Sequence, residues 1–352
     1  MPRLRTVSPS DPGISRVRRG RGFVYLDRDE RVTDELVIER IRSLVIPPAW
    51  NDVWICRYAN GHIQAVGSDV KLRRQYLYHP LWRQQRDELK HDRVLKVAAR
   101  LPKARETVSD HLAQDGMPRE RALATAFRLL DLGFFRIGGE TYAEQNGSYG
   151  LATITRDQVS VEDGLIAFDY VAKSGKERYV ALGDPEVVDA VQALRRRRSG
   201  GQELLAYRAG RSWVDITSDD INEYVKQVVG GEVSAKDFRT WHGTVLAAVA
   251  LAVSTNVADT PSARKRAIAR AMREVSDYLG NTPAVARASY VDPRVIDLFE
   301  DGVTIESALR RLGEGAATGH PATHGPVERA VLKMLRTAPA AGRRAARRRD
   351  AR

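Results

Sequence analysis

The sequence predicts an α+β protein with a small β-rich N-terminal domain and a larger, mainly α-helical domain that contains a β-meander. Three observations predict this class: a hairpin signal at Asn60–Gly61, helical periodicity that dominates after about residue 90, and short strand-like segments over residues 151–182. The 352 residues suffice for two domains and a tail. We therefore expect a flexible basic N-terminus (1–20), a β-rich domain (21–90), a helical domain (91–320) and a basic, largely flexible tail (321–352).

The predicted β-rich domain contains one hairpin and one short helix. Strands are expected at Val53–Tyr58 and His62–Val66, on either side of the two-residue turn. Thr33–Leu44 has the pattern of an amphipathic helix with Thr33 as its N-cap. The prolines within Ile46–Trp50 favour an extended connection into the hairpin.

The predicted helical domain contains a meander between two groups of helices. The helices are expected at Arg93–Ala99, Arg119–Leu130, Pro185–Arg195, Ser218–Val229, Arg239–Val253 and Ser262–Leu279. The strands are expected at Leu151–Ile154, Gln158–Val161, Leu165–Val171 and Arg178–Leu182, with turns at Asp163–Gly164 and Ser174–Gly175.

The charge of the chain indicates a polyanionic partner. A net charge of +12 and a pI near 9.9 favour nucleic acid over an acidic membrane surface, although charge alone does not choose between them. The tail (321–352) holds nine basic and two acidic residues. It could bind phosphates non-specifically, or it could be only a solvated, solubilising segment.

Composition argues against several other classes of protein. Cys56 is the only cysteine, so no internal disulfide is expected and a reducing, cytoplasmic location is favoured. The seven histidines are scattered without zinc spacing, and we expect no metal or other cofactor. The longest apolar run, Val245–Val253, is too short to span a bilayer, and the N-terminus has no secretory signal.

The segment from Gly280 to Pro293 can present a tyrosine hydroxyl from a rigid platform. Gly280 can close one helix, Thr282 is a natural N-cap, and Pro283 favours a first helical position. Pro293 limits the new helix to about two turns. Arg287 and Tyr290 then share a face, so we expect the hydroxyl beside this cation, although a half-buried core tyrosine would show the same pattern.

Further polar residues stand at the ends of predicted elements. Arg136 follows an apolar helix end, Lys173 lies at the lip of a turn, and Lys236 and Arg239 begin a helix. Asn281 precedes the Thr282 cap. Any one of these residues alone would more often be an ordinary surface residue, but their combination in this order is informative.

Taken together, these motifs resemble those of the bacterial type IB DNA topoisomerases of the compact, poxvirus-like kind. The matching segments are Ile46–Trp50, Lys71–Tyr78, Phe135–Gly138, Gln145–Leu151, Lys173–Lys176, Lys236–Thr240 and Leu279–Tyr290. They cover most of the chain, from about residue 20 to residue 300.

The resemblance implies a reaction on duplex DNA, preferably supercoiled, by a nucleoid-associated monomer that clamps the duplex between its two domains. One strand is cleaved by transesterification to give a 3′-phosphotyrosyl bond and a free 5′-hydroxyl, the broken strand rotates, and reversal reseals it. Neither ATP nor a metal is required.

The resemblance also implies a role for each candidate residue. Tyr290 is the nucleophile, Arg136 and Arg239 neutralise the charge that develops on the phosphate, and Lys173 protonates the leaving 5′-oxygen with Lys236 assisting. Asn281 stands where many relatives carry histidine, which indicates hydrogen bonding to a phosphate oxygen in place of proton transfer. Gly139-Glu140 is a second departure, because viral relatives carry a basic residue there.

The segment Lys71–Tyr78 resembles the stretch that approaches the major groove. Gln75 could contact an adenine edge, and the other candidates for DNA contact are Lys71, Arg73, Arg74, Tyr76 and Tyr78. Alternate residues here could also be core positions of a strand.

Two alternatives remain open at this point. A tyrosine recombinase shares the order of catalytic residues, but it usually has His-x-x-Arg where this chain has Lys236-x-x-Arg239. A non-catalytic nucleoid-binding protein would explain the charge and the tail, but it would not explain why the six candidate catalytic residues occur together.

Overall fold

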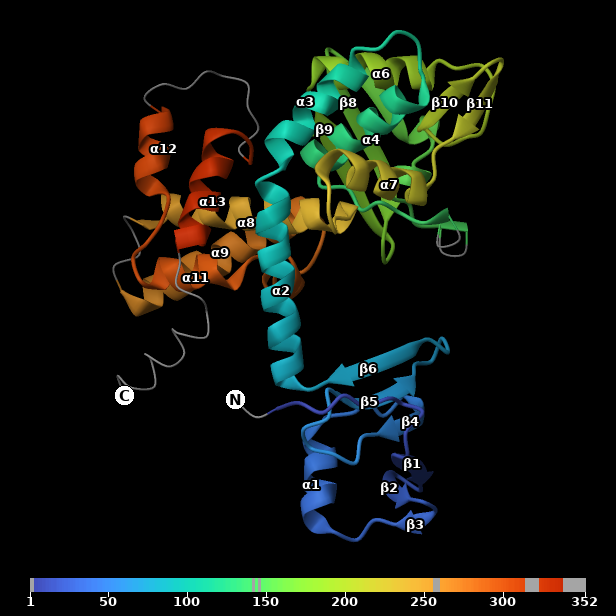
Figure 1. Ribbon diagram of the computed structural model, residues 1–352, viewed down its shortest axis with the longest axis vertical. Helices are drawn as coiled ribbons and strands as arrows, with labels where there is room; N and C mark the ends of the chain where they lie inside the picture. Colours follow the sequence, from blue (N-terminus) through green and yellow to red (C-terminus); the bar gives the residue numbers. More distant parts are fainter. Residues whose placement is uncertain (1–2, 141–142, 145–146, 256–259, 314–322, 338–352) are drawn as a thin grey trace. The chain divides into compact units, whose positions relative to one another are not determined.

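The computed structural model describes residues 3–140, 143–144, 147–255, 260–313 and 323–337. The chain divides into two compact units, Met1–His91 and Asp92–Arg352, and helix α2 (Pro80–Ala98) contains the point of division (Figure 1). The first unit is built on a β-sheet and the second is mainly helical with antiparallel sheets, which confirms the predicted fold class. Within the described residues, no helix is long and apolar enough to cross a membrane.

The first unit contains a six-stranded sheet whose paired strands are all antiparallel, in the order β3-β2-β1-β4-β5-β6. The elements are β1 (Ile14–Arg19), β2 (Gly22–Asp27), β3 (Glu30–Arg31), α1 (Glu35–Ser43), β4 (Asn51–Ile55), β5 (Ile63–Ser68) and β6 (Arg74–Tyr78). Ile41 of α1 is buried in one core cluster with Ile14, Val53 and Ile55.

Three sequence predictions for this unit were wrong in detail. Residues 14–19 are not flexible, because they form β1 and pair with both β2 and β4. The cap of α1 is Asp34, not Thr33, since its carboxylate accepts from the Leu36 and Val37 amides. The β4–β5 connection is longer than two residues, and the buried Gln64 amide closes it by donating to the Gly61 carbonyl (2.7 Å).

The second unit contains the predicted meander among helices. Its helices are α3 (Leu101–Leu112), α4 (Arg119–Gly133), α6 (Pro185–Arg195), α7 (Ser218–Val229), α8 (Ala235–Val253), α9 (Pro261–Leu279), α10 (Pro283–Ser289), α11 (Pro293–Glu300), α12 (Glu306–Gly313) and α13 (Pro326–Thr337). Its strands are β7 (Val159–Glu162), β8 (Leu165–Ala172) and β9 (Lys176–Leu182), with a separate hairpin of β10 (Ala206–Ala209) and β11 (Ser212–Asp215).

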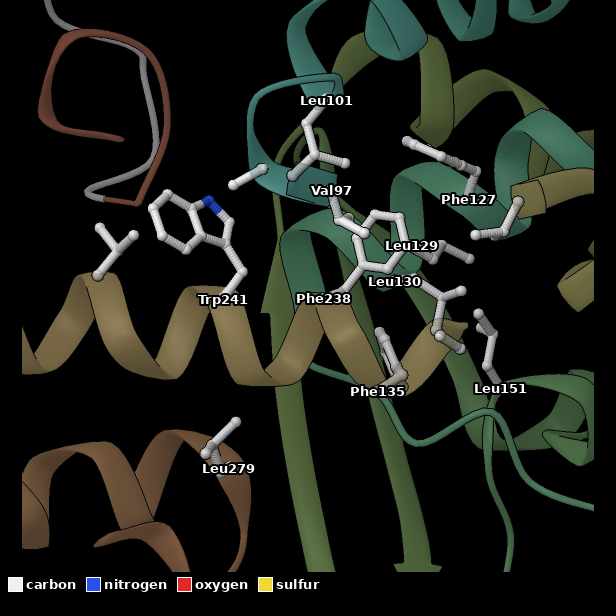
Figure 2. Packing of buried hydrophobic residues seen from close by; sticks show 14 of the residues in the cluster. Val97, Leu101, Phe127, Leu129, Leu130, Phe135, Leu151, Phe238, Trp241 and Leu279 are labelled. Atoms are coloured by element: carbon white, nitrogen blue, oxygen red, sulfur yellow. The ribbon is translucent and has the colours of Figure 1, made fainter. Parts of the chain in front are cut away.

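Most residues of helix α8 are buried, and Figure 2 shows its Phe238 and Trp241 among the side chains of the main core. Phe238 meets Phe127 of α4 edge to face, with ring centroids 5.1 Å apart, and Trp241 is fully buried one turn further along. Burying a side chain of this size contributes about 1.5–3 kcal/mol. The first turn of α8, which carries Lys236 and Arg239, is therefore fixed by aromatic packing directly behind it.

Two predictions for the second unit were also wrong. Leu151–Thr153 is a short 3₁₀ helix, not a strand, and its side chains are buried in the core. The stretch 321–352 is not simply a tail, because residues 326–337 form α13, and Val331 and Leu335 of this helix are buried in the main core. Residues 338–352 lie outside the described residues, as do residues 145–146 at the start of one of the matching motifs.

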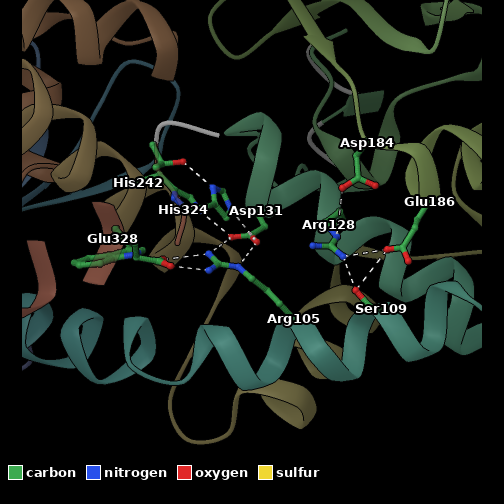
Figure 3. A network of polar contacts seen from close by, with 11 residues as sticks. Arg105, Ser109, Arg128, Asp131, Asp184, Glu186, His242, His324 and Glu328 are labelled. Atoms are coloured by element: carbon green, nitrogen blue, oxygen red, sulfur yellow. Dashed lines mark hydrogen bonds and ion pairs between the residues drawn. The ribbon is translucent and has the colours of Figure 1, made fainter. Parts of the chain in front are cut away.

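A buried polar network joins α3, α4, α8 and α13 (Figure 3). Arg105 binds the fully buried Asp131 through two nitrogens, at 2.7 and 3.0 Å, and it also binds Glu328 of α13. The imidazoles of His242 and His324 lie 3.0 and 3.1 Å from the Asp131 carboxylate. Since His242 directly follows Trp241 on α8, this network fixes the same segment of α8 as the aromatic core.

Candidate active site

The platform that carries Tyr290 forms as the sequence predicts. Gly280 ends α9 in the left-handed region (φ +60°), and Asn281 connects it to the next helix. The Thr282 hydroxyl then accepts from the Val285 amide (3.3 Å), and Pro283 occupies the first helical position of α10. Tyr290 is the C-terminal cap of this two-turn helix, so its backbone is held at a defined end of a rigid element.

Helix α8 holds the backbone of Tyr290 from the other side. The Thr244 hydroxyl lies 3.2 Å from the Tyr290 carbonyl and accepts from the Asp292 amide at 3.1 Å. A Cβ at Gly243 would lie 3.2 Å from the same carbonyl, so the glycine permits this close approach. The tyrosine is thus attached to the same helix that carries Arg239.

The structure places Arg239 beside the tyrosine, a pairing that the sequence did not predict, and the expected neighbour Arg287 is exposed. The Arg239 guanidinium carbon lies 5.1 Å from the centroid of the Tyr290 ring. Helix periodicity relates only residues of the same helix, and the residue that approaches Tyr290 comes from α8.

These cations change the acidity of the phenol. Burial raises the pKa of Tyr290, but the opposing effects of Arg239, Arg136 and Lys236 are together larger, so its pKa lies below the ordinary value. A lowered pKa increases the fraction of phenolate, which is the nucleophilic form. The site therefore brings together an activated hydroxyl and three of the predicted cationic side chains.

Three arginines bind the last turn of α9, one to each of three successive carbonyls. Arg178 donates to the Tyr278 carbonyl, Arg239 to Leu279 (2.7 Å), and Arg136 to Gly280 (3.2 Å). Carbonyls at a helix C-terminus lack helical partners and carry partial negative charge, so this turn attracts cations. Arg136 also donates to the Asn281 side-chain oxygen at 2.5 Å, which brings Asn281 into the group.

Sequence reasoning missed Arg178, the third of these arginines. Its strand was predicted, but nothing in a strand pattern indicates that one basic residue on it will reach a distant helix end. The one available signal was its place across the β8–β9 hairpin from Tyr170, five residues after Lys173. The polar network around Asp131 was missed for the same reason.

Several donors at the site have no partner among the described residues. They are the Nε atoms of Arg178 and Arg239 and the side-chain nitrogen of Asn281, all of which are buried. Burial, followed by the charge of Arg136, lowers the pKa of Arg239 to about 10, so this side chain stays charged at neutral pH. Buried donors without partners are costly, and an anion with several oxygens would satisfy them.

The two lysines stand apart from this buried group. Lys236 is exposed on the first turn of α8, where its charge still acts on Tyr290. Lys173 is exposed in the turn between β8 and β9, and no hydrogen bond or ion pair joins it to the other five candidates within the described part of the chain. The structure thus groups Arg136, Arg239, Asn281 and Tyr290 with Lys236, and leaves Lys173 on a projecting hairpin.

The candidate DNA-contact residues lie on the β5–β6 hairpin of the first unit. Leu77 packs into the core, while Tyr76 and Tyr78 are exposed on the other face with their rings stacked 6.0 Å apart. Lys71, Arg73 and Arg74 are exposed. The segment is thus a strand with one core face, as one interpretation expected, and one exposed aromatic and basic face, while its contact with DNA stays a prediction.

The Asp69 carboxylate organises the turn of this hairpin. It accepts from the backbone amides of Lys71 and Arg73 and from the Gln75 side chain (3.0 Å). The hydrogen bond from the Arg73 side chain is the main cause that lowers the pKa of Asp69 to about 2. Gln75 is therefore held by Asp69 in this structure and would have to release it to contact a base.

Within the described residues, one cluster of acidic and histidine side chains is close enough to hold a metal ion. It consists of Asp131, His242 and His324, whose possible ligand atoms lie within 4.8 Å of one another. The Asp131 oxygens already bind the Arg105 guanidinium and both imidazoles. Because Arg105 supplies the positive charge that a metal would bring, the donor set fits a structural network better than a metal centre.

Two family models match this chain. The catalytic core of eukaryotic DNA topoisomerase I matches residues 79–305, and the N-terminal domain of bacterial DNA topoisomerase IB matches residues 22–69. DNA topoisomerase 1B of Acanthamoeba polyphaga mimivirus is 30% identical over 302 residues, which cover 82% of this chain and 88% of the viral protein. Monkeypox virus DNA topoisomerase I and vaccinia virus (strain Copenhagen) DNA topoisomerase 1B are each 21% identical over 238 residues, which cover 67% of this chain and 72% of each relative.

The match over most of the chain defines the class, which is that of the DNA topoisomerase I enzymes. With the bacterial N-terminal domain and the similarity to the mimivirus enzyme, the chain belongs to the type IB DNA topoisomerase family. The resemblance inferred from the motifs is thereby confirmed, and neither the recombinase nor the non-catalytic alternative is retained.

Proposed function

We propose that this protein relaxes supercoiled duplex DNA by transient cleavage of one strand, rotation of that strand and religation, without ATP or a metal ion. The observation that carries the proposal is the approach of Arg239 to within 5.1 Å of the Tyr290 ring, with Arg136 and Asn281 bonded beside it. A polarised phenol next to fixed cations and unpartnered donors has the components that phosphoryl transfer requires.

The proposed reaction begins when Tyr290, as phenolate, attacks a backbone phosphorus. Its oxygen bonds to phosphorus as the bond to the 5′-oxygen breaks, and negative charge develops on the non-bridging oxygens. Arg136 and Arg239 exchange their carbonyl partners for these oxygens, and Asn281 donates its free side-chain N–H. The product is a 3′-phosphotyrosyl bond, which the 5′-hydroxyl attacks in the reverse reaction.

The leaving 5′-oxygen needs a proton, and we assign its delivery to Lys173 with the assistance of Lys236. Lys173 stands at the exposed turn of the β8–β9 hairpin, where it can reach a bound duplex without displacing core residues. A 5′-bridging sulfur leaves as a thiolate without a proton, so loss of Lys173 should slow cleavage of the natural oxygen far more than cleavage of the sulfur.

The first unit supplies duplex contacts in this proposal. Lys71, Arg73 and Arg74 neutralise phosphates, and the exposed Tyr76 and Tyr78 touch the backbone or stack. We further propose that the protein acts as a monomer and prefers supercoiled DNA. The domain boundaries in this proposal are those expected from the sequence, except that β1 belongs to the first unit and α13 to the second.

The test is relaxation of a supercoiled plasmid in EDTA without ATP, with SDS added to trap covalent adducts. Relaxed topoisomers and a 3′-linked adduct that is absent in Tyr290→Phe would support the proposal. Tyr290→Phe should keep its affinity for DNA, since the ring remains. Binding without relaxation or adduct in the wild-type protein would refute it.

A further inference from the structure

The β8–β9 hairpin connects the candidate general acid to the last turn of α9. Lys173 stands in its turn, and five residues later Arg178 lies on β9 directly opposite Tyr170 of β8. The two strands keep a continuous antiparallel register from Ile166↔Leu182 to Ala172↔Lys176. Whatever fixes the position of Arg178 therefore also fixes the base of the segment that projects Lys173.

Arg178 holds that base through two attachments. Its guanidinium interacts with the phenol of Tyr170, its partner on the neighbouring strand, and donates a hydrogen bond to the Tyr278 carbonyl at the end of α9. Burial raises the pKa of Tyr170, so its hydroxyl stays protonated and offers a neutral acceptor oxygen. The arginine thus bridges the hairpin and the helix end.

The Arg178 guanidinium lies directly against the backbone of Gly280, the residue that ends α9. A Cβ at Gly280 would lie 2.7 Å from Nη1 of Arg178 and 3.6 Å from its guanidinium carbon. Gly280 is also the residue whose carbonyl binds Arg136, and Asn281 follows it. The guanidinium therefore packs against the turn that places Asn281 and Arg136 at the site.

We propose that Arg178 is a positioning residue for proton transfer, which docks the β8–β9 hairpin onto the C-terminal turn of α9 and so places Lys173 relative to the scissile phosphate. The inference rests on the proposed function, because it requires Lys173 to protonate the 5′-oxygen. Arg239 binds the same turn but is assigned to the non-bridging oxygens in the proposed reaction, so Arg239→Ala should slow cleavage with both leaving groups alike.

The ratio of the cleavage rates with an oxygen and a sulfur leaving group distinguishes positioning of the acid from a merely structural role. In the natural substrate the phosphorus–oxygen bond breaks and the 5′-oxygen takes a proton from Lys173. With a 5′-bridging sulfur the phosphorus–sulfur bond breaks and the sulfur keeps the electron pair without a proton. A residue that acts by positioning Lys173 should matter for the first reaction and much less for the second, because only the first needs the acid.

The experiment measures single-turnover cleavage of matched oxygen and 5′-bridging-sulfur DNA duplexes by the wild-type protein, Arg178→Ala, Lys173→Ala and Arg239→Ala. Arg208→Ala is the matched control, since Arg208 is an exposed arginine on another hairpin, β10–β11, where it lies over the Trp213 ring. Tyr170→Phe removes one attachment of Arg178 with little change of shape. Far-UV circular dichroism during heating shows which variants fold.

We expect Arg178→Ala to slow cleavage of the oxygen substrate roughly 10–100-fold, less than the full general-acid effect of about 10²–10⁴-fold because Lys173 itself is still present. Most of that rate should return on the sulfur substrate, as we also expect for Lys173→Ala. Tyr170→Phe should show the same pattern with a smaller loss, and Arg208→Ala should match the wild type.

If Arg178→Ala and Tyr170→Phe slowed cleavage of the oxygen and the sulfur substrate by the same factor, the inference would be overturned while the proposed function stayed intact. If Lys173→Ala itself were not rescued by sulfur, the inference would also fail, because no acid would remain for Arg178 to position. Failure of the wild-type protein to form an adduct on either substrate would refute the proposed function instead.

Discussion

Replacement of Asp131 by asparagine should strongly destabilise the helical unit. Asp131 is fully buried, and its carboxylate binds Arg105 at 2.7 and 3.0 Å and the His242 imidazole at 3.0 Å. Asparagine keeps the shape but removes the charge and turns two N–H groups toward neighbours that are themselves donors. Removing one partner from a buried ion pair costs about 3–5 kcal/mol.

The structure indicates the lower end of that range. Arg105 is not left alone in Asp131→Asn, because it keeps Glu328 at 2.6 Å. We therefore expect the free energy of unfolding to fall by about 3 kcal/mol in Asp131→Asn, whereas the total for a typical protein is about 5–15 kcal/mol. With a urea m-value of about 3 kcal/mol per molar for a domain of this size, the midpoint should fall by about 1 M.

The assay is urea unfolding at pH 7 followed by far-UV circular dichroism, which reports mainly on the helical unit. Asp189→Asn is the matched control, because Asp189 also binds an arginine, Arg121, at 2.6 Å, but its side chain is 71% exposed. An exposed pair contributes about 0–1 kcal/mol, so this midpoint should hardly move. Equal midpoint shifts for the two variants would refute the reasoning that burial makes the Asp131 network important.

Three further predictions concern the active site and the response to pH. Arg239→Ala should reduce the cleavage rate roughly 10²–10³-fold in a single-turnover assay while the protein still folds, and a loss below about tenfold would argue against a role on the phosphate. Gly280→Ala should destabilise the protein by about 1–2 kcal/mol and slow cleavage, since φ is +60° and a Cβ would meet Arg178 at 2.7 Å; unchanged thermal unfolding and cleavage would contradict this. Burial lowers the pKa of His242 below its usual range, so the unfolded chain takes up this proton at a higher pH than the folded protein does. Stability should therefore fall as the pH drops below about 6.5, and a His242→Gln variant should show a weaker dependence between about pH 5 and 7, as urea titrations at several pH values would reveal.

Local signals predicted the elements that carry their own start and stop residues. The bounds of α6 and α7 were predicted correctly, because Asp184 and Thr217 cap them and apolar periodicity runs between the ends. α10 followed from Thr282 and Pro283. β1 was missed because its stability comes from pairing with β2 and β4, which no local pattern in residues 14–19 reveals.

The site was predictable as a set of residues but not as an arrangement. The motif resemblance supplied Arg136, Arg239, Asn281 and Tyr290, and the structure brings these together. The partner of Tyr290 could not be read from the sequence, because α8 and α10 meet only in the folded chain. The same holds for Arg178, whose contact with α9 spans 100 residues of sequence.

The last turn of α9 offers the arginines of the site an internal substitute for a phosphate. Carbonyl oxygens with partial negative charge bind the same guanidinium groups that a phosphate would engage, so the protein itself holds these side chains in place ahead of the substrate. A phosphate must displace these carbonyls, and part of its binding energy is offset by the bonds that are broken. We expect this exchange to keep both binding and release of the DNA backbone close to balance, which the proposed cleavage and religation of one strand would require.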